Sequence, residues 1–107
     1  SGSKYKQFAI EMILPLFYKK CEEKYIELMN LTIGEQIFFK ENKSIVATLS
    51  QNNKFSYNEK LFSLYDLTKK IKENEKLDNI PEDYISGNYW ELNSGTLLHE
   101  LYEKNSK

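Results

Sequence analysis

Apolar and polar residues alternate through the middle of the chain. The apolar residues that recur at every second position are Ile37 and Phe39, then Ile45, Ala47 and Leu49, then Phe55 and Tyr57. A period of two is typical of strands that bury one face. Asn42-Lys43 and Asn52-Asn53 fall at the breaks, and asparagine tolerates the positive φ that tight hairpin turns require. The pattern predicts an antiparallel β-meander.

In the segment before the meander, apolar residues recur at helical spacing. Over residues 4–30 the spacing predicts one amphipathic helix or two, with the apolar stripe Phe8, Met12, Ile13, Leu16, Phe17, Cys21, Tyr25, Leu28 and Met29. Pro15 lies inside the stripe and predicts either a kink or the first turn of a second helix. We favour packing of this stripe against the sheet, and a helix that binds a partner is the alternative.

Capping signals mark a central helix after the meander. Ser63 can accept a hydrogen bond from the first turn, and Asp66 suits the positive end of the helix dipole. Leu64, Leu67 and Ile71 give this helix its apolar stripe.

Shorter elements are expected towards the C-terminus. We expect a short strand or extended piece at Tyr84-Ile85, a turn at Gly87-Asn88 and a last strand over residues 89–92. Thr96 is expected to cap a final short helix. The prediction is an α+β domain with an N-terminal amphipathic helix, a small antiparallel meander, a capped central helix, a late strand and a short C-terminal helix.

Charge is unevenly spread in this 107-residue chain, whose net charge is −1. Residues 32–72 contain seven lysines and four acidic residues, whereas residues 73–107 contain three lysines and eight acidic residues. The basic part is compatible with an anion-binding face, although an ordinary solvated surface is the favoured interpretation. Every basic residue is a lysine, so the chain lacks the planar guanidinium that recognises guanine and phosphate bidentately.

Composition also indicates where in the cell the protein is expected. No apolar run approaches the roughly 20 residues that span a bilayer, so we expect no membrane contact. The single Cys21 fits a reducing cytoplasm, which is the expected location. Residues 1–3 are typical of a cloning scar, so we expect a domain from a longer protein.

Candidate catalytic residues are few. His99 and Cys21 are the only residues of their kinds, which leaves a His/Cys metal cluster without ligands. The triplet Glu41-Asn42-Lys43 resembles part of a nuclease motif, but it falls in an expected turn and every aspartate comes later in the chain. The four glycines are too scattered for a phosphate loop. We therefore expect no catalysis and no cofactor in this chain, although the parent protein could be an enzyme.

The order of these elements and motifs resembles the RAMA domain, the restriction enzyme and adenine methylase associated module. The resemblance covers about residues 31–102 and rests on residues 31–35, 37–39, 47–49, 55–57, 61–68, 87–90 and 95–98. Two positions depart from the family: its Ser-Pro-Ser helix start is here Ser63-Leu64-Tyr65, and its Asn-Gly-Trp is here Asn88-Tyr89-Trp90. On this interpretation residues 4–30 form a helical segment and residues 31–107 form the RAMA-like module.

The resemblance implies a non-catalytic DNA-binding accessory domain of a restriction, modification or defence protein, with methylated adenine as a candidate ligand. The residues we select for DNA contact are Lys54, Tyr57, Lys60, Ser63, Asn88, Tyr89 and Trp90. Aromatic rings among them can stack on a displaced base, whereas the competing and favoured role for Trp90 is core packing. The alternative function is a protein-interaction or oligomerisation module that uses the N-terminal amphipathic helix, with other domains of the parent protein or a second copy as partner.

Overall fold

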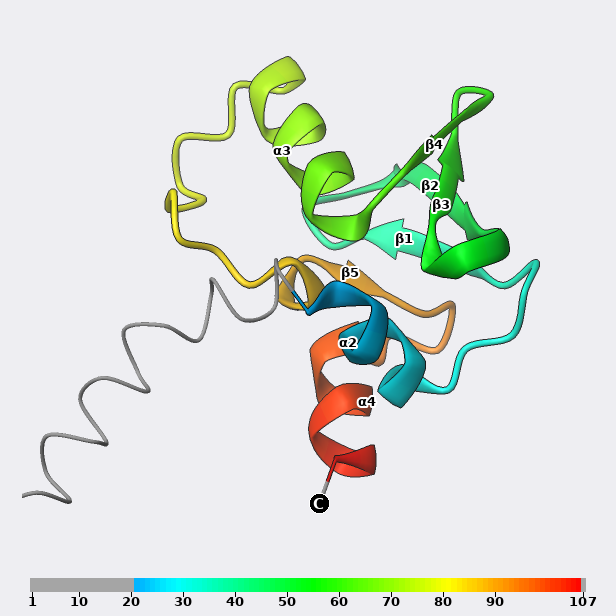
Figure 1. Cartoon of the computed structure of the whole chain (residues 1–107). Coiled ribbons are helices and arrows are strands. Elements are labelled where there is room, and N and C mark those ends of the chain that lie inside the picture. The colour runs from blue at the N-terminus through cyan, green and yellow to red at the C-terminus, as the bar shows by residue number, and fades with distance from the viewer. Residues whose placement is uncertain (1–20, 107) are drawn as a thin grey trace, which may run out of the picture.

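The computed structural model describes residues 21–106 as three helices around a five-stranded antiparallel sheet (Figure 1). The strands are β1 (Gln36–Phe39), β2 (Asn42–Leu49), β3 (Phe55–Tyr57), β4 (Lys60–Phe62) and β5 (Trp90–Glu91), and their spatial order is β4-β3-β2-β1-β5. The helices are α2 (Glu22–Met29), α3 (Leu64–Asn74) and α4 (Leu98–Asn105), with 3₁₀ turns η1 (Gln51–Asn53) and η2 (Ser86–Asn88). The predicted α+β class is therefore confirmed.

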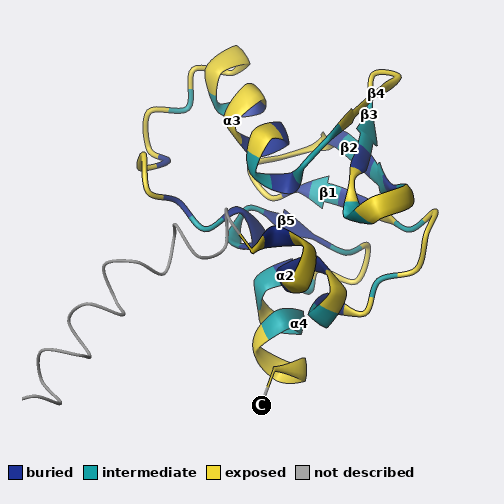
Figure 2. Cartoon of the chain, viewed as in Figure 1, coloured by how far each residue is buried: buried dark blue, intermediate teal, exposed yellow. Residues whose placement is uncertain are grey.

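The alternating apolar residues of β1 and β2 are the ones that the structure buries. Ile37 and Phe39 of β1 and Ile45, Ala47 and Leu49 of β2 are buried, while the residues between them are more exposed (Figure 2). These side chains pack with the stripe of α3, as expected for a sheet with one covered face. The predicted stripe of Leu64, Leu67 and Ile71 is buried, and the same helix also buries Thr68.

The turns differ in part from the prediction. The β1–β2 turn lies at Lys40-Glu41, so the prediction of a turn at Asn42-Lys43 was wrong. Asn42 instead begins β2, where its side-chain oxygen accepts hydrogen bonds from the backbone N–H and the hydroxyl of Ser44 at 3.1 and 2.6 Å. Asn52 and Asn53 have φ of 59°, as predicted for that break.

Strand β4 was not predicted. It follows β3 through a two-residue turn at Asn58 and Glu59, whose φ values are 50° and 65°. Two consecutive positive φ values define the type I′ hairpin, whose twist matches that of the flanking strands. The strand was missed because its central residue, Leu61, is 59% exposed and adds nothing to the buried pattern.

Most of the apolar side chains of helix α2 are buried inside the domain. Tyr25, Ile26 and Met29 are at most 2% exposed, and α2 lies beside α4 (Figure 1). Tyr25 and Met29 of the predicted stripe are therefore core residues, whereas Cys21 is exposed, and the main contacts of α2 are with α4 and η1 rather than with the sheet. The rest of the predicted helical segment, with Pro15, lies outside the described residues.

The C-terminal predictions were correct for the elements but not for their details. Trp90–Glu91 forms the late strand, and Gly87-Asn88 lies in η2. No strand forms at Tyr84-Ile85, although Ile85 has the extended backbone that the prediction also allowed. Thr96 does not cap α4, because Leu97 takes the N-cap position. The Thr96 hydroxyl instead lies 3.1 Å from the Ser94 hydroxyl, and its carbonyl accepts from the backbone N–H of Leu92 at 2.9 Å.

Trp90 joins the late strand to α3. Its side chain is fully buried and meets the Phe39 ring edge to face, with centroids 5.2 Å apart. The indole Nε1–H donates to the Thr68 hydroxyl at 2.9 Å, and that hydroxyl donates to the Leu64 carbonyl at 2.8 Å. Because the indole N–H and the Thr68 hydroxyl both have partners, the contact stabilises the core without an orphaned donor.

Candidate nucleic-acid interface

The N-terminus of α3 is occupied by the protein's own oxygen atoms. The Ser63 hydroxyl accepts from the backbone N–H of Asp66 at 3.1 Å, which confirms the predicted cap. The Glu22 carboxylate accepts from the N–H groups of Leu64 and Tyr65 at 2.9 and 2.8 Å. Burial raises the pKa of Glu22, and the two backbone hydrogen bonds oppose that rise. Since an internal carboxylate already takes these donors, Ser63 acts here as a structural cap.

Lys54 and Ser63 line one surface hollow. The hollow encloses about 410 Å³ and is also lined by Glu22, Glu23, Asn52, Tyr65 and Asp66. Three carboxylates against one lysine disfavour a phosphate inside this hollow. Lys54 is exposed, so its amine can still meet a phosphate at the rim.

Tyr57 and Lys60 face each other across the β3–β4 hairpin, where they are paired residues of the two strands. Paired residues of an antiparallel ladder have Cβ atoms about 4.5–5.5 Å apart and point to the same face. Tyr57 is half-buried and Lys60 is exposed. The hairpin therefore presents an aromatic ring beside a cation, which is the combination that binds a base and its phosphate.

Trp90 does not contribute to a surface. Because its side chain is fully buried against Phe39 and Thr68, it has no ring face on which a base could stack. The favoured core role is the one the structure shows, and we remove Trp90 from the interface. Asn88 is half-buried in η2, where its backbone N–H donates to the Ile85 carbonyl at 3.0 Å.

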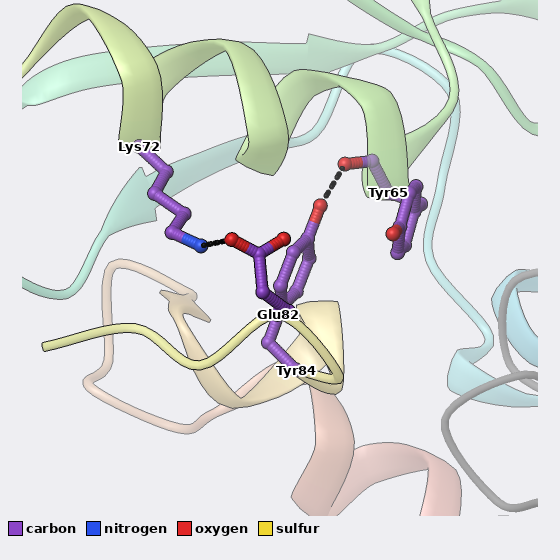
Figure 3. Close-up of polar contacts among 4 residues, drawn as sticks. All are labelled: Tyr65, Lys72, Glu82 and Tyr84. Carbon is purple, nitrogen blue, oxygen red and sulfur yellow. Dashed lines mark hydrogen bonds and ion pairs between the residues drawn. The ribbon is translucent and has the colours of Figure 1, made fainter. Parts of the chain in front are cut away.

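Tyr89 belongs to a row of three tyrosines that the sequence did not indicate. Tyr65 and Tyr84 stack with ring centroids 4.8 Å apart and planes at 11°, and Tyr89 meets Tyr84 edge to face at 6.4 Å. The Tyr84 hydroxyl donates to the Tyr65 carbonyl at 2.8 Å (Figure 3). Burial raises the pKa of Tyr84 above its ordinary value and also raises that of Tyr89. Tyr84 and Tyr89 therefore lose their hydroxyl protons less readily than a solvent-exposed tyrosine.

A second hollow, called here the Lys72 hollow, lies beside this row. It encloses about 430 Å³ and is lined by Tyr65, Lys69, Lys72, Glu73, Lys76, Leu77, Asp78, Glu82 and Tyr84. Lys72 makes an ion pair with Glu82, with 3.3 Å between Nζ and Oε1 (Figure 3). Tyr65, Lys69 and Lys72 lie at helical spacing on α3, and this spacing is the signal that could have indicated the hollow.

Two lysines of α3 are exposed, one beside the hairpin and one at the Lys72 hollow. Lys69 and Lys70 are exposed, and the Lys70 amine lies 6.0 Å from the centre of the Phe62 ring of β4. Helix α3 and the β3–β4 hairpin lie at the end of the molecule opposite the C-terminus (Figure 1). We call the four exposed lysines Lys54, Lys60, Lys69 and Lys70, together with the half-buried Tyr57, the hairpin–α3 surface.

His99 takes part in a partly buried polar contact. The Tyr25 hydroxyl lies 2.8 Å from His99 Nδ1, and Glu103 lies 3.6 Å from Nε2. Burial lowers the pKa of His99, while Glu103 opposes that change. Among residues 21–106, no three His, Cys, Asp or Glu side chains are grouped so that they could hold a metal ion. Helices long and apolar enough to cross a membrane are likewise absent from the described part.

Comparison with models of known protein families, with curated proteins and with solved structures found no match for this chain.

Proposed function

We propose that this chain is a non-catalytic DNA-binding module that contacts DNA through the hairpin–α3 surface. The observation that carries the proposal is the free charge on that surface. Lys54, Lys60, Lys69 and Lys70 are all exposed, and none of the four makes an ion pair with a residue in the described range. Free lysines attract the phosphate backbone and release its condensed counterions on binding.

The surface suits backbone contact better than readout of base edges. A lysine amine is a compact point charge, whereas bidentate recognition of guanine requires the arginine fork that this chain lacks. Tyr57 beside Lys60 adds one site for an unpaired base, where stacking contributes about 1–3 kcal/mol. We therefore propose weak sequence preference and stronger binding to DNA with an unpaired base.

The wider biological role rests on the resemblance alone. A module of this kind would help a restriction, modification or defence enzyme engage DNA, and N6-methyladenine is the candidate base. Catalysis would then reside in other domains of the parent protein.

The test is fluorescence anisotropy of labelled duplex and single-stranded DNA, with and without N6-methyladenine, at low salt. The proposal predicts binding that weakens in the K60Q/K70Q variant and is unchanged in K104Q, because Lys104 lies in α4 at the opposite end of the molecule. A Tyr57→Leu variant should lose the preference for single strands. Absence of binding to every DNA at low salt would overturn the proposal.

One observation favours a second candidate, association with another copy of the chain. Strand β4 is an edge strand of the sheet, and its Leu61 is exposed. An uncovered edge presents unpaired backbone groups to a second strand. Sedimentation at several concentrations distinguishes the two, since this candidate predicts a mass that rises with concentration in the absence of DNA.

A further inference from the structure

Lys72 and Glu82, which pair in the Lys72 hollow, differ strongly in the solvent exposure of their side chains. The Lys72 side chain is 16% exposed and projects from α3, whereas the Glu82 side chain is 98% exposed and comes from the segment after the helix (Figure 3). The helix and the surrounding side chains therefore fix the lysine, while water surrounds the carboxylate. If the pair separates, Lys72 stays in place and Glu82 moves away.

The ion pair itself is weak. A carboxylate surrounded by water gains little from one cation, because the solvent screens the charge and the side chain loses freedom when it is held. A polyanion can compete for Lys72, because neighbouring lysines hold several of its charges at once. A phosphate diester offers two unesterified oxygens that share its charge, and several diesters on one chain bind together.

The lining of the Lys72 hollow favours an anion once Glu82 has left. Lys69, Lys72 and Lys76 carry three positive charges, and Glu73, Asp78 and Glu82 carry three negative charges, so the lining is neutral. Departure of Glu82 leaves a formal charge of +1. Lys69 is shared with the hairpin–α3 surface, so a DNA strand on that surface passes the mouth of the hollow.

We propose that Glu82 is an internal stand-in for phosphate, and that a DNA phosphate displaces it from Lys72. This inference rests on the proposed function and deepens it, because it names the chemical group that enters the hollow. Glu82 then lowers the affinity for DNA, so that isolated phosphates are excluded while a strand held by neighbouring lysines can enter. The charge of Lys72 also lies within electrostatic reach of Tyr89, which places the hollow beside the tyrosine row.

The first experiment compares DNA binding by E82Q and E100Q, which change the net charge equally. Glu100 is exposed on α4 and serves as the matched control. We expect E82Q to bind about two- to five-fold more tightly than E100Q, the range that corresponds to loss of one exposed ion pair. In a K72Q background the E82Q change should have no further effect. Equal affinities of E82Q and E100Q in a protein that binds DNA would overturn the inference.

The second experiment uses inorganic phosphate and does not depend on DNA binding. Phosphate is titrated into wild type, E82Q and E100Q while NMR follows the side-chain resonances of Lys72. The inference predicts saturable shifts at lower phosphate concentration in E82Q than in the other two proteins. If the protein does not bind DNA but shows this phosphate response, the proposed function is refuted and the displacement of Glu82 is not. If E82Q and E100Q respond at the same phosphate concentration, the displacement of Glu82 is refuted.

Discussion

The Thr68→Val variant tests the contact that joins the late strand to α3. Valine has nearly the shape of threonine, but it removes the hydroxyl that accepts from Trp90 Nε1 at 2.9 Å. Both side chains are fully buried, so the indole N–H would have no water as a replacement partner. The Leu64 carbonyl would also lose the bond that the hydroxyl donates to it, while keeping its ordinary helical bond.

The expected loss in free energy of unfolding follows from the indole N–H, which is left without a hydrogen-bond partner. Leaving a buried donor without a partner costs about 1–3 kcal/mol. In a domain of this size, each kcal/mol lowers Tm by about 4–8 °C, so a fall of about 4–24 °C is expected. Trp90 is the only tryptophan in the chain, so its fluorescence reports directly on this contact.

The assay is equilibrium unfolding in urea, followed by that fluorescence. Thr48→Val is the matched control, because Thr48 is half-buried in β2, where valine suits a strand equally well. We expect T68V to lose free energy of unfolding while T48V stays close to wild type. If T68V is as stable as T48V, the hydrogen bond does not anchor β5 as described.

Two further predictions concern α2 and its neighbours. Glu22→Gln should lower the free energy of unfolding at pH 7 by about 1–3 kcal/mol in urea titrations, because one amide oxygen cannot serve both N–H groups that the carboxylate now serves. Burial raises the pKa of Glu22 in the fold, so the stability linked to its protonation is present at low pH and is lost as pH rises through that pKa. The difference in free energy of unfolding between wild type and E22Q should therefore shrink with rising pH. A difference that stays constant or grows would contradict this. Gly87→Ala should destabilise the domain by about 1–3 kcal/mol, because a Cβ would collide with the Tyr25 hydroxyl. The Y25F change should recover part of that loss, and a double variant as unstable as G87A would contradict the stated cause.

Periodicity in the sequence was sufficient to predict most of the scaffold. Ile37 and Phe39, or Leu64, Leu67 and Ile71, each bury a face because their spacing matches the strand or the helix that contains them. Strand β4 was missed because a three-residue strand with an outward Leu61 has no period to detect. Thr96 was predicted to be a cap by residue type, but the bridge between Glu91 and Leu97 keeps that region extended, and α4 therefore begins later.

The candidate site was harder to predict, because it depends on contacts between distant residues. The stacked pair Tyr65 and Tyr84 is separated by 19 positions, and no local pattern brings these two rings together. The pairing of Glu22 with the start of α3 spans 42 positions, and it converts an expected anion site into an internal contact. Trp90 was selected for its ring chemistry, whereas its burial depends on Phe39 and Thr68 from other elements. Lys54 and Lys60 are exposed, and that exposure could be predicted because lysines beside a hairpin need no long-range contact to reach solvent.

The salt dependence of DNA binding tests the central claim most directly. The measurement is the affinity of wild type, K60Q/K70Q and K104Q for one duplex between low and moderate salt. If the four exposed lysines of the hairpin–α3 surface each neutralise a phosphate, log K should fall with log salt at a slope of about −3 to −4. The slope should become shallower by about 2 in K60Q/K70Q and stay unchanged in K104Q. Equal slopes for all three proteins, or no measurable binding at low salt, would contradict DNA contact through this surface.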